Sequence, residues 1–233
     1  MLWAISFFNY ADRAALFTLF PLLEREMHLS LVQLGLLGSS FAWMYGLLAP
    51  FSGNLVDRIS RKKAVLGGLY AWSVIAACTS LSRGFHQLLG FMTAEGVGES
   101  LYYPASMSML SDYHGPETRS RAMGLHQTSV YVGTIAGGFF AGLIGEHYGW
   151  RWSFIVFGGT GLLLGLFLLR YLREPVRSRT IGVETALKPG LVEVLAYISK
   201  TPAALLLLAG FCCANFVAMV LLSWMPKYLY DRF

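Results

Sequence analysis

Two oppositely charged side chains, Asp12 and Arg13, lie inside the first long apolar stretch of the chain, residues 1–23. A charge in the middle of a membrane costs about 2.5–3.5 kcal/mol on an insertion scale, and such residues are usually functional. Because neighbouring residues on a helix do not face each other, each charge needs its own partner or a wet cavity. The alternative is a shallow helix that leaves both charges in the membrane interface.

Two acidic residues, Glu95 and Glu99, lie in a later apolar stretch, residues 87–110. They are four residues apart and share one helix face. That face continues with Tyr102, Tyr103 and Ser106. A buried carboxylate favours its neutral form, so protonation or a nearby cation can switch its charge. We expect Arg13 to meet Glu99 and to couple a proton to another event; the alternative is a static buried ion pair.

Further polar side chains inside apolar stretches are candidates to line the same internal site. They are Asn9, Tyr45, Tyr103, His126, Gln127 and Tyr131. The last three lie within about one and a half turns of one helix and are expected to face a cavity. For His126, a hydrogen-bonded histidine of the core is the alternative.

The composition excludes an ordinary soluble domain. Of the 233 residues, 55% are hydrophobic and 13% are charged, whereas about 25% charged residues are usual. A net charge of +5 could suggest a nucleic-acid partner, but the charges gather in short loops between apolar stretches, which membrane topology explains better. The expected fold class is all-α, a polytopic membrane protein, with no nucleic-acid partner.

Apolar stretches of about 20 residues, the length that crosses a bilayer as a helix, predict seven membrane-spanning helices. They are residues 1–23, 31–56, 64–81, 87–110, 122–144, 152–172 and 202–228. Most of the 18 Lys and Arg residues follow the second, fourth and sixth helices, which predicts a cytoplasmic amino terminus in a multi-pass protein of the cell membrane. The first stretch lacks the basic start and cleavage site of a signal peptide.

The spans predict three parts of the chain. Residues 1–172 form a six-helix bundle, residues 173–200 a cytoplasmic linker with an amphipathic helix, and residues 201–233 a seventh helix. Glycines spaced four apart in residues 133–145 predict close helix packing. An internal match predicts two inverted three-helix repeats, with chance similarity as the alternative. The match relates Gly53, Asp57, Arg58, Ser60 and Lys62 to Gly142, Glu146, His147, Gly149 and Arg151.

The connection at residues 53–63 places one acid beside a basic cluster, in the order G-N-L-V-D-R-I-S-R-K-K. Asp57 ends a helix, where the macrodipole disfavours an anion, so it needs a cationic partner. This segment resembles the loop between helices two and three of the major facilitator superfamily, and residues 115–122 resemble its loop between helices four and five; a plain topogenic loop is the alternative for the second. The resemblance implies a conformational gate made of Gly53, Asp57, Arg58, Arg61, Lys62, Arg119 and Arg121.

Asn-Tyr-Ala-Asp-Arg in the first helix and Gly-Val-Gly-Glu in the fourth resemble the spinster-like lipid carriers and the organic anion:cation symporters of that superfamily. The resemblance implies proton-dependent transport through Asp12, Arg13 and Glu99. Met92 stands where these families usually have arginine, and Glu95 is an additional acid. It also implies substrate binding between two six-helix bundles, of which the second is absent here, so a missing second half is an expected partner beside the lipid bilayer.

The expected function is a secondary active transporter, proton-coupled and working by alternating access, for an organic anion or an amphiphilic, lysolipid-like substrate. A truncated or non-transporting fragment, or one half of a two-chain transporter, is the alternative. A light-driven pump is disfavoured because residues 201–226 contain no lysine. An enzyme is not expected, since no nucleophile, base and oxyanion donors gather. No cofactor is expected beyond an ion gradient, and Cys78, Cys212 and Cys213 lack metal-ligand spacing.

Overall fold

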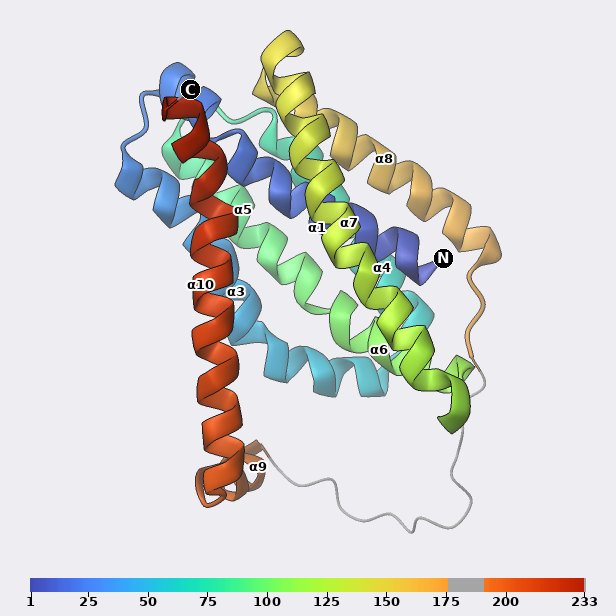
Figure 1. Ribbon diagram of the computed structural model, residues 1–233. Coiled ribbons are helices and arrows are strands. Elements are labelled where there is room, and N and C mark those ends of the chain that lie inside the picture. Colours follow the sequence, from blue (N-terminus) through green and yellow to red (C-terminus); the bar gives the residue numbers. More distant parts are fainter. Residues whose placement is uncertain (176–190, 233) are drawn as a thin grey trace.

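The computed structural model describes residues 1–175 and 191–232, and the regular structure within them is helical (Figure 1). The helices are α1 (Leu2–Thr18), α2 (Phe20–Met27), α3 (Leu31–Arg58), α4 (Arg61–Thr79), α5 (Phe85–Ser100), α6 (Tyr102–Tyr113), α7 (Pro116–Tyr148), α8 (Trp150–Tyr171), α9 (Leu191–Ser199) and α10 (Pro202–Arg232). The middle of the predicted linker, residues 176–190, lies outside this description, as do the side chains of Asp57 and Arg58. The amphipathic face predicted for the linker stays a prediction.

The helices follow the seven predicted spans in order. In the described residues, four helical segments are long and apolar enough to cross a membrane: Leu31–Gly53 of α3, and the whole of α7, α8 and α10. The other three spans correspond to α1 with α2, to α4, and to α5 with α6. These three are shorter or interrupted, and two of them carry the ionisable residues identified above.

Consecutive spans run in alternating directions, so the connections fall at two ends of the bundle (Figure 1). We call the end that holds the α3–α4 connection, the α6–α7 connection and the end of α8 the basic end, and the other the opposite end. The three most extensive helix pairs are α1 with α7, α4 with α8, and α3 with α5. In a repeat, the first three spans correspond to the next three, so that α1 corresponds to α5, α3 to α7, and α4 to α8. Under this correspondence the α1–α7 pair becomes the α5–α3 pair, and the α4–α8 pair becomes itself. The packing therefore follows the inverted repeat of three and three helices.

Local sequence explains where helices begin and break. Ser30 and Gln33 form a capping box at the start of α3, in which each side chain bonds the other's backbone N–H,. The fourth span breaks into α5 and α6 at Leu101, three residues before Pro104. Proline has no N–H for the carbonyl one turn earlier, so the ladder cannot continue there unchanged.

Two buried apolar clusters form the core, one toward each end. The cluster toward the basic end includes Ile5 and Met109, and that toward the opposite end includes Leu19 and Phe154. Along α1 the change from one cluster to the other falls at residues 9–12, which include the buried polar side chains Asn9 and Asp12. The bundle therefore contains a polar layer between two apolar ones.

Glycines of α7 bring that helix against the backbone of α1, as the spacing in residues 133–145 predicts. A β-carbon on Gly133 would collide with the carbonyl oxygen of Phe7, and one on Gly137 would collide with the backbone of Ala11. Because helices in lipid associate largely by close packing, these two positions hold α1 and α7 together.

Replacing Gly137 with alanine is expected to lower the thermal unfolding midpoint of the detergent-solubilised protein. The new methyl group must push α1 away from α7, and overpacking of this kind costs about 1–3 kcal/mol. Gly159→Ala in α8 is the matched control, since its β-carbon would have nothing within 4 Å. An unchanged midpoint in Gly137→Ala would contradict the close contact.

Candidate functional site

An ion pair between Arg13 of α1 and Glu99 of α5 lies at the centre of the polar layer. Arg13 Nε donates a hydrogen bond to Glu99 Oε2 at 2.5 Å, and Nη2 of the same guanidinium contacts the same oxygen. Glu99 is 1% exposed, whereas the Arg13 side chain is 24% exposed. The pair predicted from the sequence is present, and its cationic half remains open to an incoming group.

Three aromatic rings surround the Arg13 guanidinium. Its carbon lies 4.6 Å from the ring centre of Phe41, 4.9 Å from that of Tyr45 and 5.0 Å from that of Tyr10. Rings at these distances attract a cation through their negative faces. Arginine is therefore held in place by α1 and α3 as well as by its acid on α5.

Two glycines between the acids of α5 set the positions of its neighbours. A β-carbon on Gly96 would lie 2.8 Å from the Phe41 carbonyl oxygen of α3, and one on Gly98 would lie 3.0 Å from the Trp72 nitrogen of α4. The first contact is closer than a β-carbon allows, and the second is tight. Gly96 thus brings α3 and its rings close enough to reach Arg13, and Gly98 brings α4 against α5.

A second contact within the polar layer joins Asp12 of α1 to Glu95 of α5. The two side chains are within hydrogen-bonding contact and are 6% and 7% exposed. One oxygen of each, Oδ1 and Oε1, has no hydrogen-bond partner. The buried side chain of Asn9 lies beside Glu99. All four ionisable residues predicted for the site are therefore brought together.

The remaining predicted site residues divide into two places. Tyr103 and Tyr131 are 43% and 65% exposed and lie within electrostatic reach of Tyr10, the α1 ring beside Arg13. Gln127 is exposed. His126 is instead 4% exposed and lines a separate cavity.

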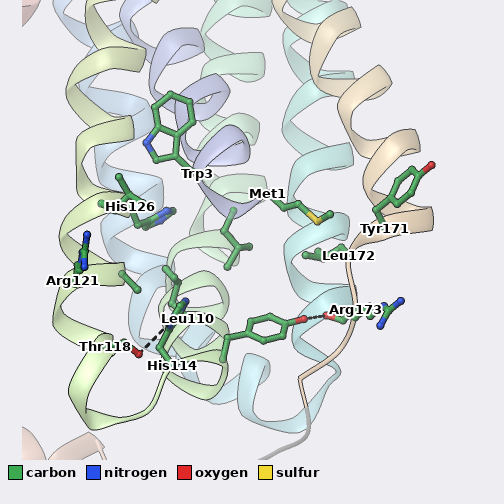
Figure 2. Close-up of a pocket in the computed structure, with 14 residues that line it drawn as sticks. Met1, Trp3, Leu110, His114, Thr118, Arg121, His126, Tyr171, Leu172 and Arg173 are labelled. Carbon is green, nitrogen blue, oxygen red and sulfur yellow. Dashed lines mark hydrogen bonds between the residues drawn. The ribbon is translucent and has the colours of Figure 1, made fainter.

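That cavity lies at the basic end between α1, α6, α7 and α8, with a volume of about 730 Å³. Figure 2 shows His126, Trp3 and Arg121 among the residues that line it. His126 and Tyr131 are five residues apart, which at about 100° per residue places them about 140° apart around the helix. His126 thus faces this cavity, whereas Gln127 and Tyr131 are not among the residues that line it.

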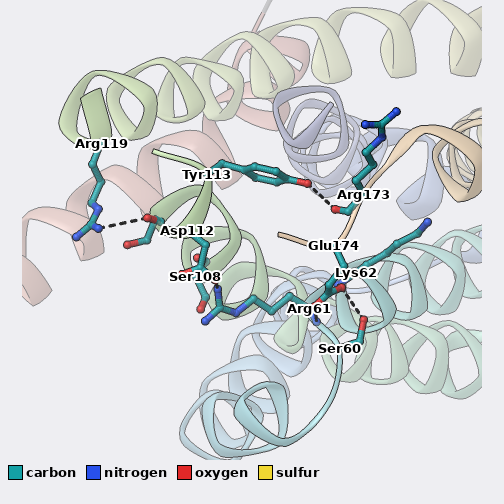
Figure 3. Close-up of polar contacts among 10 residues, drawn as sticks. Ser60, Arg61, Lys62, Ser108, Asp112, Tyr113, Arg119, Arg173 and Glu174 are labelled. Atoms are coloured by element: carbon teal, nitrogen blue, oxygen red, sulfur yellow. Dashed lines mark hydrogen bonds and ion pairs between the residues drawn. The ribbon is translucent and has the colours of Figure 1, made fainter. Parts of the chain in front are cut away.

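Three of the predicted gate residues, Arg61, Lys62 and Arg119, make polar contacts at the basic end (Figure 3). Arg61 forms an ion pair with Asp112 of α6 and donates to the Ser108 carbonyl at 3.2 Å. Arg119 donates to the Ser111 carbonyl, also at 3.2 Å. Arg121 lies in the wall of the cavity. Helices α4, α6 and α7 are thereby linked at this end.

Glu174, which follows α8, links that helix to the start of α4 at the same end. Its carboxylate accepts hydrogen bonds from the Ser60 hydroxyl at 2.6 Å and from the backbone nitrogens of Arg61 and Lys62 at 2.9 and 2.8 Å. An anion at a helix N-terminus is stabilised by the free N–H groups and the macrodipole. Glu174 and Asp112 were missed from the sequence; the usable signals were a Glu-Pro pair just after a span and a single acid near the end of another.

The family model described as Major Facilitator Superfamily matches residues 2–233. The chain belongs to the major facilitator superfamily. Among relatives, the hexuronate transporter of Bacillus subtilis (strain 168) is 27% identical over 228 residues, covering 96% of this chain and 54% of that protein. Protein spinster homolog 1 of Homo sapiens is 29% identical over 235 residues, covering 97% of this chain and 44% of that protein.

A solved structure shares the fold of this superfamily member. It is a bacterial homolog of the human lysosomal transporter spinster in an inward-facing, unoccupied conformation, with a TM-score of 0.86 and 26% identity over 98% of this chain and 54% of that one. The present chain spans about half the length of the relatives that it matches. Membership in this family of transporters indicates a protein that is not an enzyme. The described residues contain no group of three or more His, Cys, Asp or Glu that could hold a metal ion.

The superfamily's seventh helix, here α10, joins the opposite end of the bundle. Lys227 Nζ donates to Glu24 Oε2 of α2 at 2.5 Å and to Asp231 at 2.7 Å. Beside it, Trp224 meets Phe20 edge to face, with ring centres 5.7 Å apart. This end of α10 is therefore attached to the first bundle, while most of its remaining length is exposed.

Proposed function

We propose that the chain belongs to a secondary active transporter that couples an ion gradient, in the first instance a proton gradient, to movement of an organic anion or an amphiphilic, lipid-like anion. The observation that carries this proposal is the Arg13–Glu99 pair: a fully buried acid neutralises a cation that is partly open. Membership in a family of transporters supports transport across a membrane, and the Arg13–Glu99 pair supports the coupling of that transport to a proton.

The chemistry of the pair links a proton to an anion. Ionised Glu99 neutralises Arg13 and competes with any substrate anion for it. A proton taken up by the Glu99 carboxylate cancels that competition, and Arg13 can then form charge-assisted hydrogen bonds with the substrate. Release of the proton restores the internal pair and displaces the substrate, so binding of each favours binding of the other.

The substrate class follows from the surroundings of Arg13. A guanidinium recognises a carboxylate or phosphate group, and the exposed rings of Tyr103 and Tyr131 offer faces to a sugar ring or an acyl chain. The relatives named for hexuronate and for L-galactonate support a sugar acid as the first candidate. The spinster relatives support a lysolipid-like amphiphile as the second.

The orientation and the extent of the transporter are part of the proposal. We place the basic end in the cytoplasm, because Lys and Arg concentrate there. Residues 1–172 would supply one bundle and residues 201–233 the start of a second. A fragment without transport, or half of a two-chain transporter, is the alternative; a reading frame that continues past residue 233 with five further spans would exclude both.

Uptake into liposomes tests the proposal. The product of the complete reading frame is reconstituted and offered labelled galactonate, glucuronate or lysophosphatidylcholine, with a pH gradient imposed in either direction. At least one compound is expected to accumulate above its external concentration, and a protonophore should abolish the accumulation. Uptake of every compound at the level of protein-free liposomes would contradict the proposal.

A further inference from the structure

We infer that Asp12 and Glu95 form a carboxyl–carboxylate pair that holds one proton, at a site separate from the Arg13–Glu99 pair. The two side chains come from α1 and α5, are at least nine-tenths buried and are in contact. Ionised carboxylates are acceptors only, so a hydrogen bond between two of them requires a proton on one. Proton binding by this pair does not depend on the proposed function. A role of the pair in transport would rest on that function.

The balance of charge around the pair leads to the same conclusion. The polar layer contains three acids, Asp12, Glu95 and Glu99, and one neighbouring cation. That cation, Arg13, already directs two nitrogens at Glu99. Three buried carboxylates against one guanidinium would leave two uncompensated negative charges side by side, an arrangement that low dielectric makes very costly. One proton removes the repulsion between Asp12 and Glu95.

Arg13 is the described cation that acts on both Asp12 and Glu95. The helices packed against α1 and α5 carry further titratable or basic side chains, which include Tyr45 of α3, Arg61 and Tyr70 of α4, Tyr102 and Tyr103 of α6, Arg119, His126 and Tyr131 of α7, Arg151 of α8, and Lys227 of α10. Arg61 pairs with Asp112, and Arg119 bonds the Ser111 carbonyl. Lys227 bonds Glu24 and Asp231, and Arg151 pairs with Glu26. His126 lines the separate cavity. One helical turn before Glu95, the buried side chain is the uncharged Met92.

Some oxygen atoms of the Asp12–Glu95 pair have no hydrogen-bond partner. Asp12 Oδ1 and Glu95 Oε1 are buried without partners. Loss of the shared proton would place two carboxylates in direct contact, and like charges in a buried site repel strongly. Deprotonation would thus favour separation of α1 from α5, whereas protonation holds these two helices together.

Infrared spectroscopy of the complete protein in liposomes tests the site without requiring transport. At neutral pH the wild type is expected to show the carbonyl stretch of a buried protonated carboxyl group, shifted by deuterium exchange. Glu95→Gln and Asp12→Asn should each lose this band, because the new amide donates to the remaining carboxylate and no proton is needed. Glu99→Gln and Glu117→Gln, the latter in the exposed first turn of α7, should retain it.

The outcomes separate this inference from the proposed function. Absence of the band in the wild type, or its persistence in both Glu95→Gln and Asp12→Asn, would overturn the shared proton even if transport is proton-driven. Loss of the band in Glu99→Gln alone would assign the proton to Glu99 and equally overturn it. A band with the expected pattern supports the pair, and it does so even in a protein that accumulates none of the compounds tested above.

Discussion

Glu99→Gln is expected to abolish proton-driven accumulation while leaving exchange of substrate across the membrane intact. Glutamine keeps the size of the side chain and one acceptor oxygen for Arg13, but it cannot take up a proton. The wild type should bind substrate anion more weakly as the pH rises, because ionised Glu99 then competes for Arg13. In Glu99→Gln the competitor carries no charge at any pH, so affinity should be independent of pH.

The comparison requires two measurements on the same liposome preparations. Net uptake against a pH gradient should fall to the protein-free background in Glu99→Gln, and counterflow between equal concentrations of labelled and unlabelled substrate should persist. Glu146→Gln, an exposed position near the end of α7, is the matched control and should behave as wild type. Unchanged accumulation in Glu99→Gln would remove this acid from the mechanism, whereas loss of both activities would show a role in folding or binding.

The central ion pair could be predicted because the sequence leaves few choices. Arg13 is the one basic residue deep inside the first five predicted spans, and a membrane interior requires it to find an acid,. Glu99 then follows from its position in the fourth span. The glycines of α7 were equally informative, since their spacing of four residues marks one helix face whatever that face contacts.

The pairing of Asp12 with Glu95 could not be predicted in the same way. It depends on the rotation of α1 relative to α5, which the whole bundle determines and no local pattern records. The hydrogen bonds of Glu174 join residues more than 100 positions apart, and nothing near Glu174 in the chain identifies its partners. His126 and Tyr131 lie close together in the sequence, but five residues on a helix place them on different faces, so their surroundings could not be inferred from that nearness alone.

Arg13→Lys is expected to weaken substrate binding by about 10- to 100-fold even though it conserves the charge. Three rings lie within 5.0 Å of the guanidinium carbon, and each cation–ring contact contributes about 0.5–1 kcal/mol. A lysine ammonium is more strongly hydrated, lacks the flat surface that stacks on the rings, and cannot present two parallel N–H groups to a carboxylate. The dissociation constant, measured by substrate-dependent thermal stabilisation, should rise accordingly.

Arg25→Lys provides the matched control, because Arg25 also stacks on a ring, that of Tyr230 at 5.0 Å, but at the opposite end of the bundle. Its effect on the dissociation constant should be less than twofold. If Arg13→Lys bound substrate as tightly as wild type, charge alone would account for recognition, and the rings of Tyr10, Phe41 and Tyr45 would serve only the fold. A loss confined to Arg13→Lys would instead show that the flat guanidinium, positioned by the rings of α3 where that helix packs on Gly96 of α5, is the group that recognises the anion.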